Sequence, residues 1–192
     1  MSIKLPITLC LLLTASTISM RAQDHVSPPR ADVAISFIGA RSLKASTSQD
    51  FWMEGGSAEL GINLWRGVGV VLDGTGLQTG SIGSSGVPLV LTTVTVGPRY
   101  RWHAEHRYSV YGQALIGEAS GSDSVFPSTS GATSNASSFA LQVDAGLDYK
   151  LSRNFSIRAV NVGYLRTKLP NGTNNIQDTL RLGAGLVFRF GR

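Results

Sequence analysis

Residues 178–190, near the end of the chain, read DTLRLGAGLVFRF and alternate between two kinds of side chain. One set of alternate positions holds Leu180, Leu182, Ala184, Leu186, Phe188 and Phe190, and the other holds Thr179, Arg181, Gly183, Gly185, Val187 and Arg189. Because successive side chains of a β-strand point to opposite faces, the stretch predicts a strand with one apolar and one arginine-bearing face. Two interpretations fit: a transmembrane strand between lipid and a polar lumen, or a half-buried strand of a soluble β-sandwich.

Residues 1–22 have the features of a secretory signal peptide. Lys4 precedes an apolar run that extends to about Met20, and the small residue Ala22 stands where a signal peptidase would cut. The run contains Pro6 and is shorter than a membrane-spanning helix requires. Cleavage after residue 19 or 23 is an alternative. We expect the signal to be removed and residues 23–192 to form a single domain.

Composition narrows the choice of fold and partner. Cys10 is the single cysteine and lies within the signal, so the processed chain would form no disulfide. Loss of Lys4 and Arg21 lowers the formal net charge from +5 to near +3, and the remaining basic residues are scattered, which argues against nucleic-acid binding. The 22 glycines, together with many serines, threonines and valines, favour β-structure with frequent turns.

Eight alternating segments are expected to form strands. They span residues 32–40, 56–65, 67–77, 89–102, 107–119, 138–150, 155–167 and 178–190. Most exceed the ~5–6 residues of a typical globular strand and suit the ~9–11 residues that a tilted strand needs to cross a bilayer. Their length therefore favours the membrane interpretation.

The connections between these segments alternate strictly between long and short. The short ones span residues 65–67, 103–106 and 151–154, and the long ones span residues 41–55, 78–88, 120–137 and 168–177. A transmembrane barrel sorts its connections in this way, with tight turns in the periplasm and larger loops outside. We expect both termini in the periplasm. The longest loop, residues 120–137, is rich in serine and predicts a flexible solvated segment, with a receptor-binding or adhesive tip as the alternative.

Charged residues of the clearly alternating strands fall on one face, which we expect to line the barrel lumen. The acids are Glu59, Asp73, Asp144 and Asp148, and the bases are Arg99, Arg101, Arg181 and Arg189. An eight-stranded barrel is just wide enough for side chains to fill it, and balanced charges would pair there. This predicts a plugged barrel; solvated charges at the rims are the alternative.

The segment over residues 155–167 does not alternate cleanly. Arg158 shares its phase with Val160 and Val162, whereas Asn161 shares its phase with Ile157. A β-bulge and an arginine at the membrane edge both fit this pattern.

Aromatic residues concentrate around the short turns and the chain end, where a barrel places one of its interfacial girdles. They are Trp65, Tyr100, Trp102, Tyr108, Tyr149, Phe155, Phe188 and Phe190.

Several motifs resemble those of a known family. They are GPRYRW at residues 97–102, YGQALIGE at 111–118, GLDYKLSRNF at 146–155, YLRT at 164–167 and LRLGAGLVFRFG at 180–191. The chain resembles small porin-family outer-membrane β-barrel proteins, with an architecture similar to the OmpA-type transmembrane domain. The resemblance implies an all-β, eight-stranded antiparallel up-and-down transmembrane barrel that follows a cleaved signal peptide, surrounded by bacterial outer-membrane lipids.

The last strand is also similar to the β-signal that the barrel-assembly machinery reads. Gly185, Phe188 and Phe190 have the matching spacing. The resemblance therefore implies the assembly machinery and periplasmic chaperones as partners during biogenesis, and we expect a monomer.

Residues suited to catalysis or metal binding are few. The histidines are His25, His103 and His106, and the latter two lie in a predicted periplasmic turn, where Glu105 and Ser109 are neighbours. That turn is at the wrong end of the barrel for chemistry at the outer leaflet, and it offers only a weak metal-ligand set. We expect neither an enzyme nor a cofactor.

The function expected is a structural or surface-interaction role, with a filled lumen and at most weak permeation. The alternatives are a small porin or channel, a lipid-modifying enzyme of the outer membrane, and a soluble secreted ligand-binding barrel. The last of these needs apolar residues inside and charges outside, the inverse of the faces above.

Overall fold

The computed structural model describes residues 30–43, 50–104, 106–128, 131–171 and 174–191. The expected signal peptide, with Cys10, lies outside the described residues, as do His25 and Glu105. No helix in the described part of the chain is long and apolar enough to cross a bilayer.

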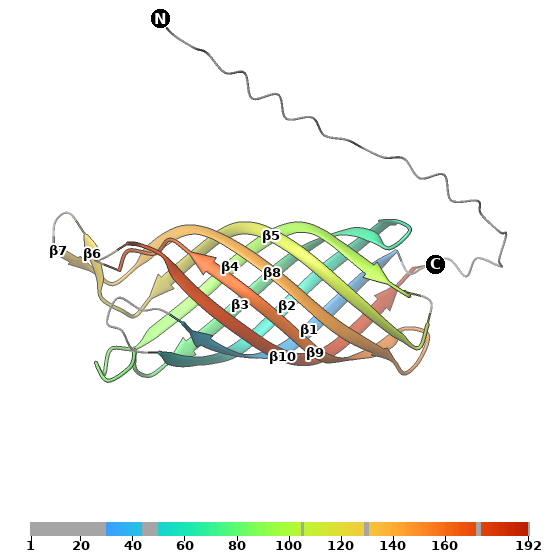
Figure 1. Ribbon diagram of the computed structural model, residues 1–192, viewed down its shortest axis with the longest axis horizontal. Helices are drawn as coiled ribbons and strands as arrows, with labels where there is room; N and C mark the ends of the chain where they lie inside the picture. The colour runs from blue at the N-terminus through green and yellow to red at the C-terminus, as the bar shows by residue number, and fades with distance from the viewer. Residues whose placement is uncertain (1–29, 44–49, 105, 129–130, 172–173, 192) are drawn as a thin grey trace, which may run out of the picture.

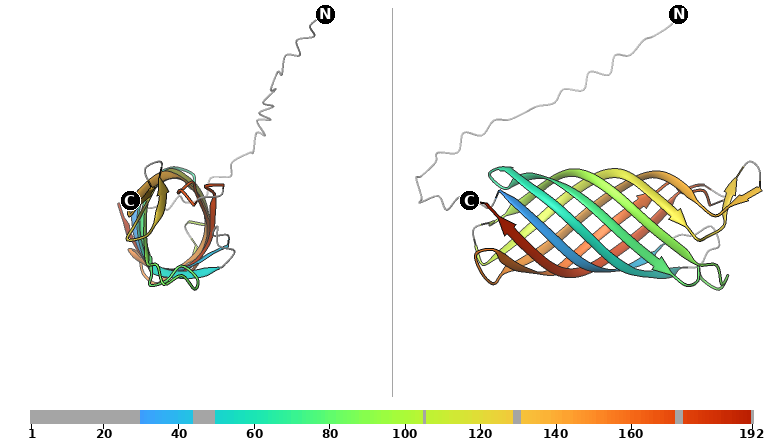
Figure 2. Two further views of the ribbon diagram at one scale, coloured as in Figure 1. Left: turned by 90° about the vertical axis from the view of Figure 1, so that its left-hand side faces the viewer. Right: turned by 180° about the vertical axis from the view of Figure 1, so that it is seen from behind.

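Eight long strands close into one antiparallel barrel (Figures 1 and 2). They are β1 (Ala31–Ser42), β2 (Phe51–Trp65), β3 (Val68–Thr79), β4 (Leu89–Trp102), β5 (Tyr108–Ser122), β8 (Ala136–Lys150), β9 (Phe155–Thr167) and β10 (Gln177–Phe190). Two short strands, β6 (Phe126–Ser128) and β7 (Gly131–Thr133), form a separate hairpin between β5 and β8. The predicted eight-stranded barrel is confirmed, and the β-sandwich interpretation is wrong.

The first and last strands close the barrel. β1 pairs with β10 from Ala31 opposite Phe190 to Ser42 opposite Thr179, and it pairs with β2 along its other edge. Every strand of the barrel therefore has a partner on both sides. Closure leaves no open sheet edge, so the backbone amides and carbonyls are satisfied within the sheet, as an apolar solvent requires.

The two ends of the barrel differ. The turn end carries the short connections, residues 66–67, 103–107 and 151–154, and the loop end carries the long ones, residues 43–50, 80–88, 123–135 and 168–176. Arg30 donates a backbone hydrogen bond to Gly191 at 3.1 Å, so both described chain ends lie at the turn end, opposite β6 and β7 (Figure 1). The predicted alternation of long and short connections is thus present.

The turn between β2 and β3 shows why a short connection works there. Arg66 has a φ of 45° and Gly67 a φ of 87°. Positive φ at both central residues is typical of the type I′ turn, whose twist matches that of a hairpin. A side chain at position 67 would also overlap the carbonyl oxygen of Arg101, so glycine is needed at this position.

The strands extend further toward the loop end than the sequence predicts. β1 ends at Ser42 and β2 begins at Phe51, so the expected loop over residues 41–55 is shorter than predicted and spans residues 43–50. The outward-facing glycine at position 56 conceals an alternation that continues to the strand's start, where Phe51 and Met53 are buried and Trp52 is exposed. The expected flexible loop over residues 120–137 is also wrong in part, because β5 and β8 extend into it and it contains the β6–β7 hairpin.

A β-bulge explains the irregular segment in β9. Leu147 pairs with Val160 and Asp148 pairs with Arg158, so Ala159 has no partner on β8. The extra residue lets Arg158 and Asn161, three positions apart, both point into the barrel with 0% and 3% exposure. The bulge interpretation is confirmed, and that of an arginine at the membrane edge is wrong.

The outer wall of the barrel is a continuous apolar surface. Leu182 is 59% exposed on β10, and the exposed residues of every other long strand include comparable side chains, such as Ile35, Ile62, Leu72, Val96, Ile116, Val143 and Val162. An exposed apolar surface of this extent is incompatible with a soluble monomer and suits a hydrocarbon environment. Trp65, Trp102 and Tyr108 are exposed beside the turn end, as expected of an interfacial girdle.

Candidate functional site

The half of the lumen nearer the turn end is filled by an ion-pair network. Arg99 on β4 donates through Nη2 to both oxygens of Asp32 on β1, at 2.7 Å to Oδ1 and 2.6 Å to Oδ2. Arg99 Nη1 also lies 3.7 Å from Glu59 Oε2 on β2. The three side chains are between 1% and 4% exposed, so their charges are compensated by one another rather than by solvent.

Arg158 joins two acids of this network. Its Nη1 lies 2.7 Å from Glu59 Oε1, and its Nε lies 3.1 Å from Asp148 Oδ1. Its guanidinium also stacks over the ring of Tyr111, with Cζ 4.4 Å from the ring centroid. Asp148 also forms an ion pair with Arg101, and Arg189 Nη2 lies 3.6 Å from Asp148 Oδ2. Asp148 is therefore surrounded by three guanidinium groups.

A second group of acids lies toward the middle of the lumen and is held mainly by amides. Gln142 donates through Nε2 to Asp144 at 2.7 Å and to Asp73 at 3.3 Å. Gln113 donates to Asp144 at 3.1 Å. The nearest cation is Arg181, whose Nη2 lies 4.0 Å from Asp73 Oδ1. Within the described residues, Asp144 has no ion pair.

All eight charged residues selected from the sequence lie buried inside the barrel. They are Glu59, Asp73, Arg99, Arg101, Asp144, Asp148, Arg181 and Arg189. Sequence reasoning missed Asp32 and Arg158, which bring the buried charges of the described residues to five acids and five arginines. Asp32 and Ser36 alternate with Val33 and Ile35, and this pattern could have placed Asp32 in the lumen. The inward orientation of Arg158 could not be predicted, because the bulge shifts the alternation in β9.

The half of the lumen nearer the loop end is apolar, whereas the sequence predicted a lumen filled by paired charges. We call this cluster the apolar plug; it consists of Ile38, Ala40, Phe51, Met53, Leu77, Leu89, Leu91, Ala119, Phe126, Ala140, Leu165 and Leu169. Its strand residues continue the inward phase of the charged ones, as Leu77 does after Asp73 on β3. The lumen is thus filled by charged groups in one half and by hydrocarbon in the other.

A cavity of about 280 Å³ lies over the apolar plug at the loop end; we call it the mouth cavity. Its apolar wall includes Phe51, Ile82, Val87, Leu89, Phe126 and Pro170. Its polar lining includes Ser42, Ser124 and Gln177. All four long connections or their flanking strand ends contribute to it, and none of its lining residues in the described part of the chain is charged.

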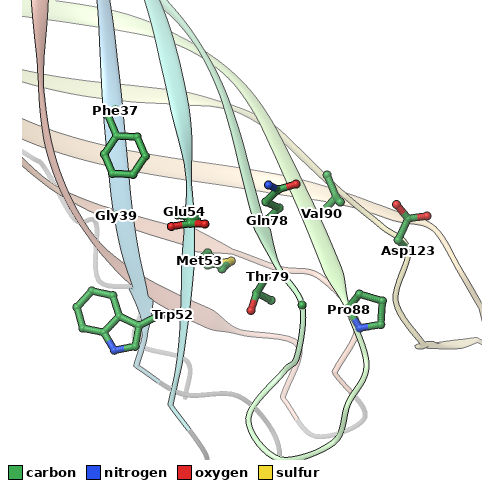
Figure 3. Close-up of a pocket in the computed structure, with 11 residues that line it drawn as sticks. Phe37, Gly39, Trp52, Met53, Glu54, Gln78, Thr79, Pro88, Val90 and Asp123 are labelled. Carbon is green, nitrogen blue, oxygen red and sulfur yellow. The ribbon is translucent and has the colours of Figure 1, made fainter.

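A second depression lies on the outer wall near the loop end, across β1 to β4 (Figure 3). It is wider, about 700 Å³, and open to the surroundings. Phe37 and Trp52, 64% and 65% exposed, lie along one side, while Glu54, Gln78 and Asp123 supply polar groups. This outer groove therefore differs from the mouth cavity in carrying two carboxylates.

The turn residues considered for chemistry do not form a site. The rings of His103 and His106 contact each other edge-on at 5.2 Å between centroids. Ser109 instead points into the lumen, where its Oγ accepts hydrogen bonds from Arg101 and Arg189 at 3.3 Å each. The suggested approach of Ser109 to a histidine is therefore wrong. Within the described ranges, no three residues of the kinds that bind metals come together.

Comparison with solved structures gives the same barrel. The chain is similar to Neisserial surface protein A, with 16% identity, a TM-score of 0.64, and coverage of 85% of this chain and 99% of that one. It is similar to Ail, the attachment invasion locus protein of Yersinia pestis, with 21% identity, a TM-score of 0.52, and coverage of 84% and 100%. OprG from Pseudomonas aeruginosa gives 11% identity, a TM-score of 0.54, and coverage of 86% and 97%.

These identities support a common fold. No curated protein matches the sequence. The family described as "Outer membrane protein beta-barrel domain" matches residues 8–190, nearly the whole chain. With the closed barrel and the apolar outer wall, this match shows that the chain belongs to the outer-membrane β-barrel family and that its place is the bacterial outer membrane.

Proposed function

We propose that this protein is a non-enzymatic barrel with a structural or surface-interaction role and at most weak permeation. The main observation in support is that side chains fill both halves of the lumen. The ion-pair network fills the half near the turn end, and the apolar plug fills the half near the loop end. An ion would have to pass charged groups that are already paired and then a hydrocarbon constriction, which excludes water.

The packing of the plug argues against the porin alternative. Leu77, Leu91 and Leu165 are between 0% and 3% exposed, although they come from three separate strands. Eight strands leave an interior just wide enough for side chains. Three buried leucines at the same end of such a barrel favour a closed constriction over an aqueous channel.

We propose that residues 1–22 are a cleaved signal, that residues 23–192 form the domain, and that the turn end faces the periplasm. The position of Arg30 beside Gly191 at the turn end supports a periplasmic location for both termini. The concentration of long connections at the opposite end supports an external location for the loop end. The mouth cavity and the β6–β7 hairpin would then face the exterior.

We propose that Gly185, Phe188 and Phe190 act in assembly, with the barrel-assembly machinery and periplasmic chaperones as transient partners. Phe188 and Phe190 are 39% and 51% exposed on the outer wall, where a partner can reach them. A side chain at Gly185 would overlap the carbonyl oxygen of Ile35 on β1, so this glycine also permits closure of the barrel. Closure of the barrel supports a monomer, because each of its eight strands is paired on both sides and offers no edge to a second copy.

The charges of the loop end bear on the type of surface partner. Ail has been solved in complex with the heparin analogue sucrose octasulfate, a polyanion. Described cations at the loop end of this chain are Arg41, Arg166 and Lys168, and described acids are Asp50, Glu54, Glu118, Asp123 and Asp178. Arg41 is paired with Asp50 and Arg166 with Asp178, at 2.7 Å each. The five described acids outnumber the three described cations, which favours a partner other than a polyanion.

A liposome-swelling assay tests the filled lumen. Vesicles containing the purified protein are expected to take up small neutral sugars no faster than protein-free vesicles, whereas an open diffusion porin in parallel vesicles gives rapid swelling. Swelling at porin-like rates would make the small-porin alternative correct.

A further inference from the structure

We propose that the mouth cavity is a binding site for a small, neutral, mainly apolar molecule that arrives from outside the cell. The proposal rests on the proposed function, because it needs the loop end outside and the lumen closed. It goes beyond that function by assigning a site and a ligand class.

The cavity is built by segments that are distant in sequence and meet at the loop end. Phe51 comes from the start of β2, Val87 and Leu89 from the β3–β4 connection and β4, Phe126 from β6, and Pro170 from the β9–β10 connection. Convergent side chains over a closed floor are the usual form of a ligand site at the mouth of a β-barrel.

The floor of the cavity is held in place before any ligand binds. Phe51, Leu89 and Phe126 are only 8%, 5% and 4% exposed because they also belong to the apolar plug. The ring of Phe126 lies against the backbone of Gly121, and a Cβ at that glycine would come within 2.5 Å of the ring. Pairing of Phe126 with Thr133 in the β6–β7 hairpin further restricts this residue. A preformed floor reduces the entropy lost on binding.

Size and polarity define the ligand class. An apolar cavity of about 150 Å³ holds benzene, so about 280 Å³ suits a molecule of one or two rings. The wall is mainly hydrocarbon, and Ser124 and Gln177 can meet one polar group. Among the described residues, those that line the cavity are all uncharged, so a charged ligand would lose its hydration without gaining a counter-charge from them. The outer groove, with Glu54 and Asp123, has the opposite character.

A matched pair of probes and a matched pair of variants test the site. Indole is the neutral two-ring probe, and indole-3-acetate carries the same rings with a carboxylate. Val87→Trp fills the mouth cavity, and Val90→Trp places the same ring in the outer groove. Amide chemical shifts of the full-length processed protein in lipid nanodiscs report binding, and empty nanodiscs correct for probe dissolved in lipid.

Indole is expected to cause saturable shifts around Leu89 and Phe126 in the wild type and in Val90→Trp. At least a tenfold weaker effect is expected for indole-3-acetate and for Val87→Trp, whose unchanged β-barrel spectrum shows that it folds. Linear, non-saturable shifts on the outer wall, or equal responses of the two valine variants, would overturn the site. Conductance of the same protein preparation in planar bilayers separates the two proposals. A closed barrel that does not bind indole contradicts only the ligand site, whereas an open channel contradicts the proposed function.

Discussion

Glu59 on β2 and Arg158 on β9 meet in the lumen, with Oε1 and Nη1 2.7 Å apart, although 99 positions separate them in sequence. β2 and β9 are not neighbours in the barrel, since β1 and β10 lie between them. The pair therefore connects separate parts of the wall through the interior. The guanidinium of Arg158 reaches this position only because the bulge in β9 turns it inward.

Arg158→Met is expected to lower the free energy of unfolding by about 3–5 kcal/mol, because Glu59 and Asp148 would each lose a buried partner. The double variant Glu59→Leu with Arg158→Met is expected to lose less than the sum of the two single changes. Urea unfolding in lipid vesicles measures both. The control is Arg41→Met, which removes a half-exposed pair with Asp50 and should change stability by about 0–1 kcal/mol. Equal effects at positions 41 and 158 would show that the lumen pair is not desolvated.

Leu182→Arg is expected to destabilise the barrel by about 2–4 kcal/mol if the residue lies near the bilayer midplane, because the new charge would face hydrocarbon. Leu182 is 59% exposed on the outer wall. Ile176→Arg is the matched control, because Ile176 is also exposed but lies in the β9–β10 connection at the loop end. The same unfolding assay applies, and full tolerance of Leu182→Arg would mean that this face does not contact lipid.

Gly121→Ala is expected to displace Phe126 and loosen the β6–β7 hairpin, because the added Cβ would meet the phenylalanine ring at 2.5 Å. The cost is about 1–3 kcal/mol, as for other overpacked sites. Gly76→Ala is the control, since a Cβ there meets no atom within 4 Å. Hydrogen exchange at Phe126 and Thr133 should accelerate in the first variant only, and unchanged exchange would show that Gly121 does not hold the hairpin.

Peptide tags test the orientation of the barrel. A tag inserted between β6 and β7 is expected to bind antibody on intact cells, whereas one inserted between Arg66 and Gly67 should bind only after the outer membrane is permeabilised. The prediction follows from the separation of long and short connections between the two ends. The reverse labelling pattern would invert the proposed topology.

The sequence was sufficient for the fold because period-two alternation reports directly on which side of a strand each residue lies. Leu182 and Asp148 were assigned to opposite faces on this basis, and the structure places one outside and the other inside. Alternation fails where an extra residue shifts the phase, so Arg158 could not be assigned before the bulge was known. It also weakens across glycine, which is why the start of β2 at Phe51 was missed.

The ion-pair partners could not be predicted from the sequence for a different reason. Arg99 reaches Asp32 across 67 positions, a contact set by how far the strands are staggered around the barrel rather than by any local pattern. The mouth cavity could not be predicted from the sequence either, because Phe126 lies in a serine-rich segment without alternation. Its burial depends on the glycine beneath its ring, which is a tertiary contact.

Single-channel recording in planar bilayers tests the filled lumen most directly. The purified monomer is expected to give no stable large conductance, and only brief, small events at most, because the paired charges around Arg158 and the plug around Leu165 occupy the lumen in series. Long-lived, large-conductance openings from the monomer would contradict the filled lumen and establish a diffusion porin.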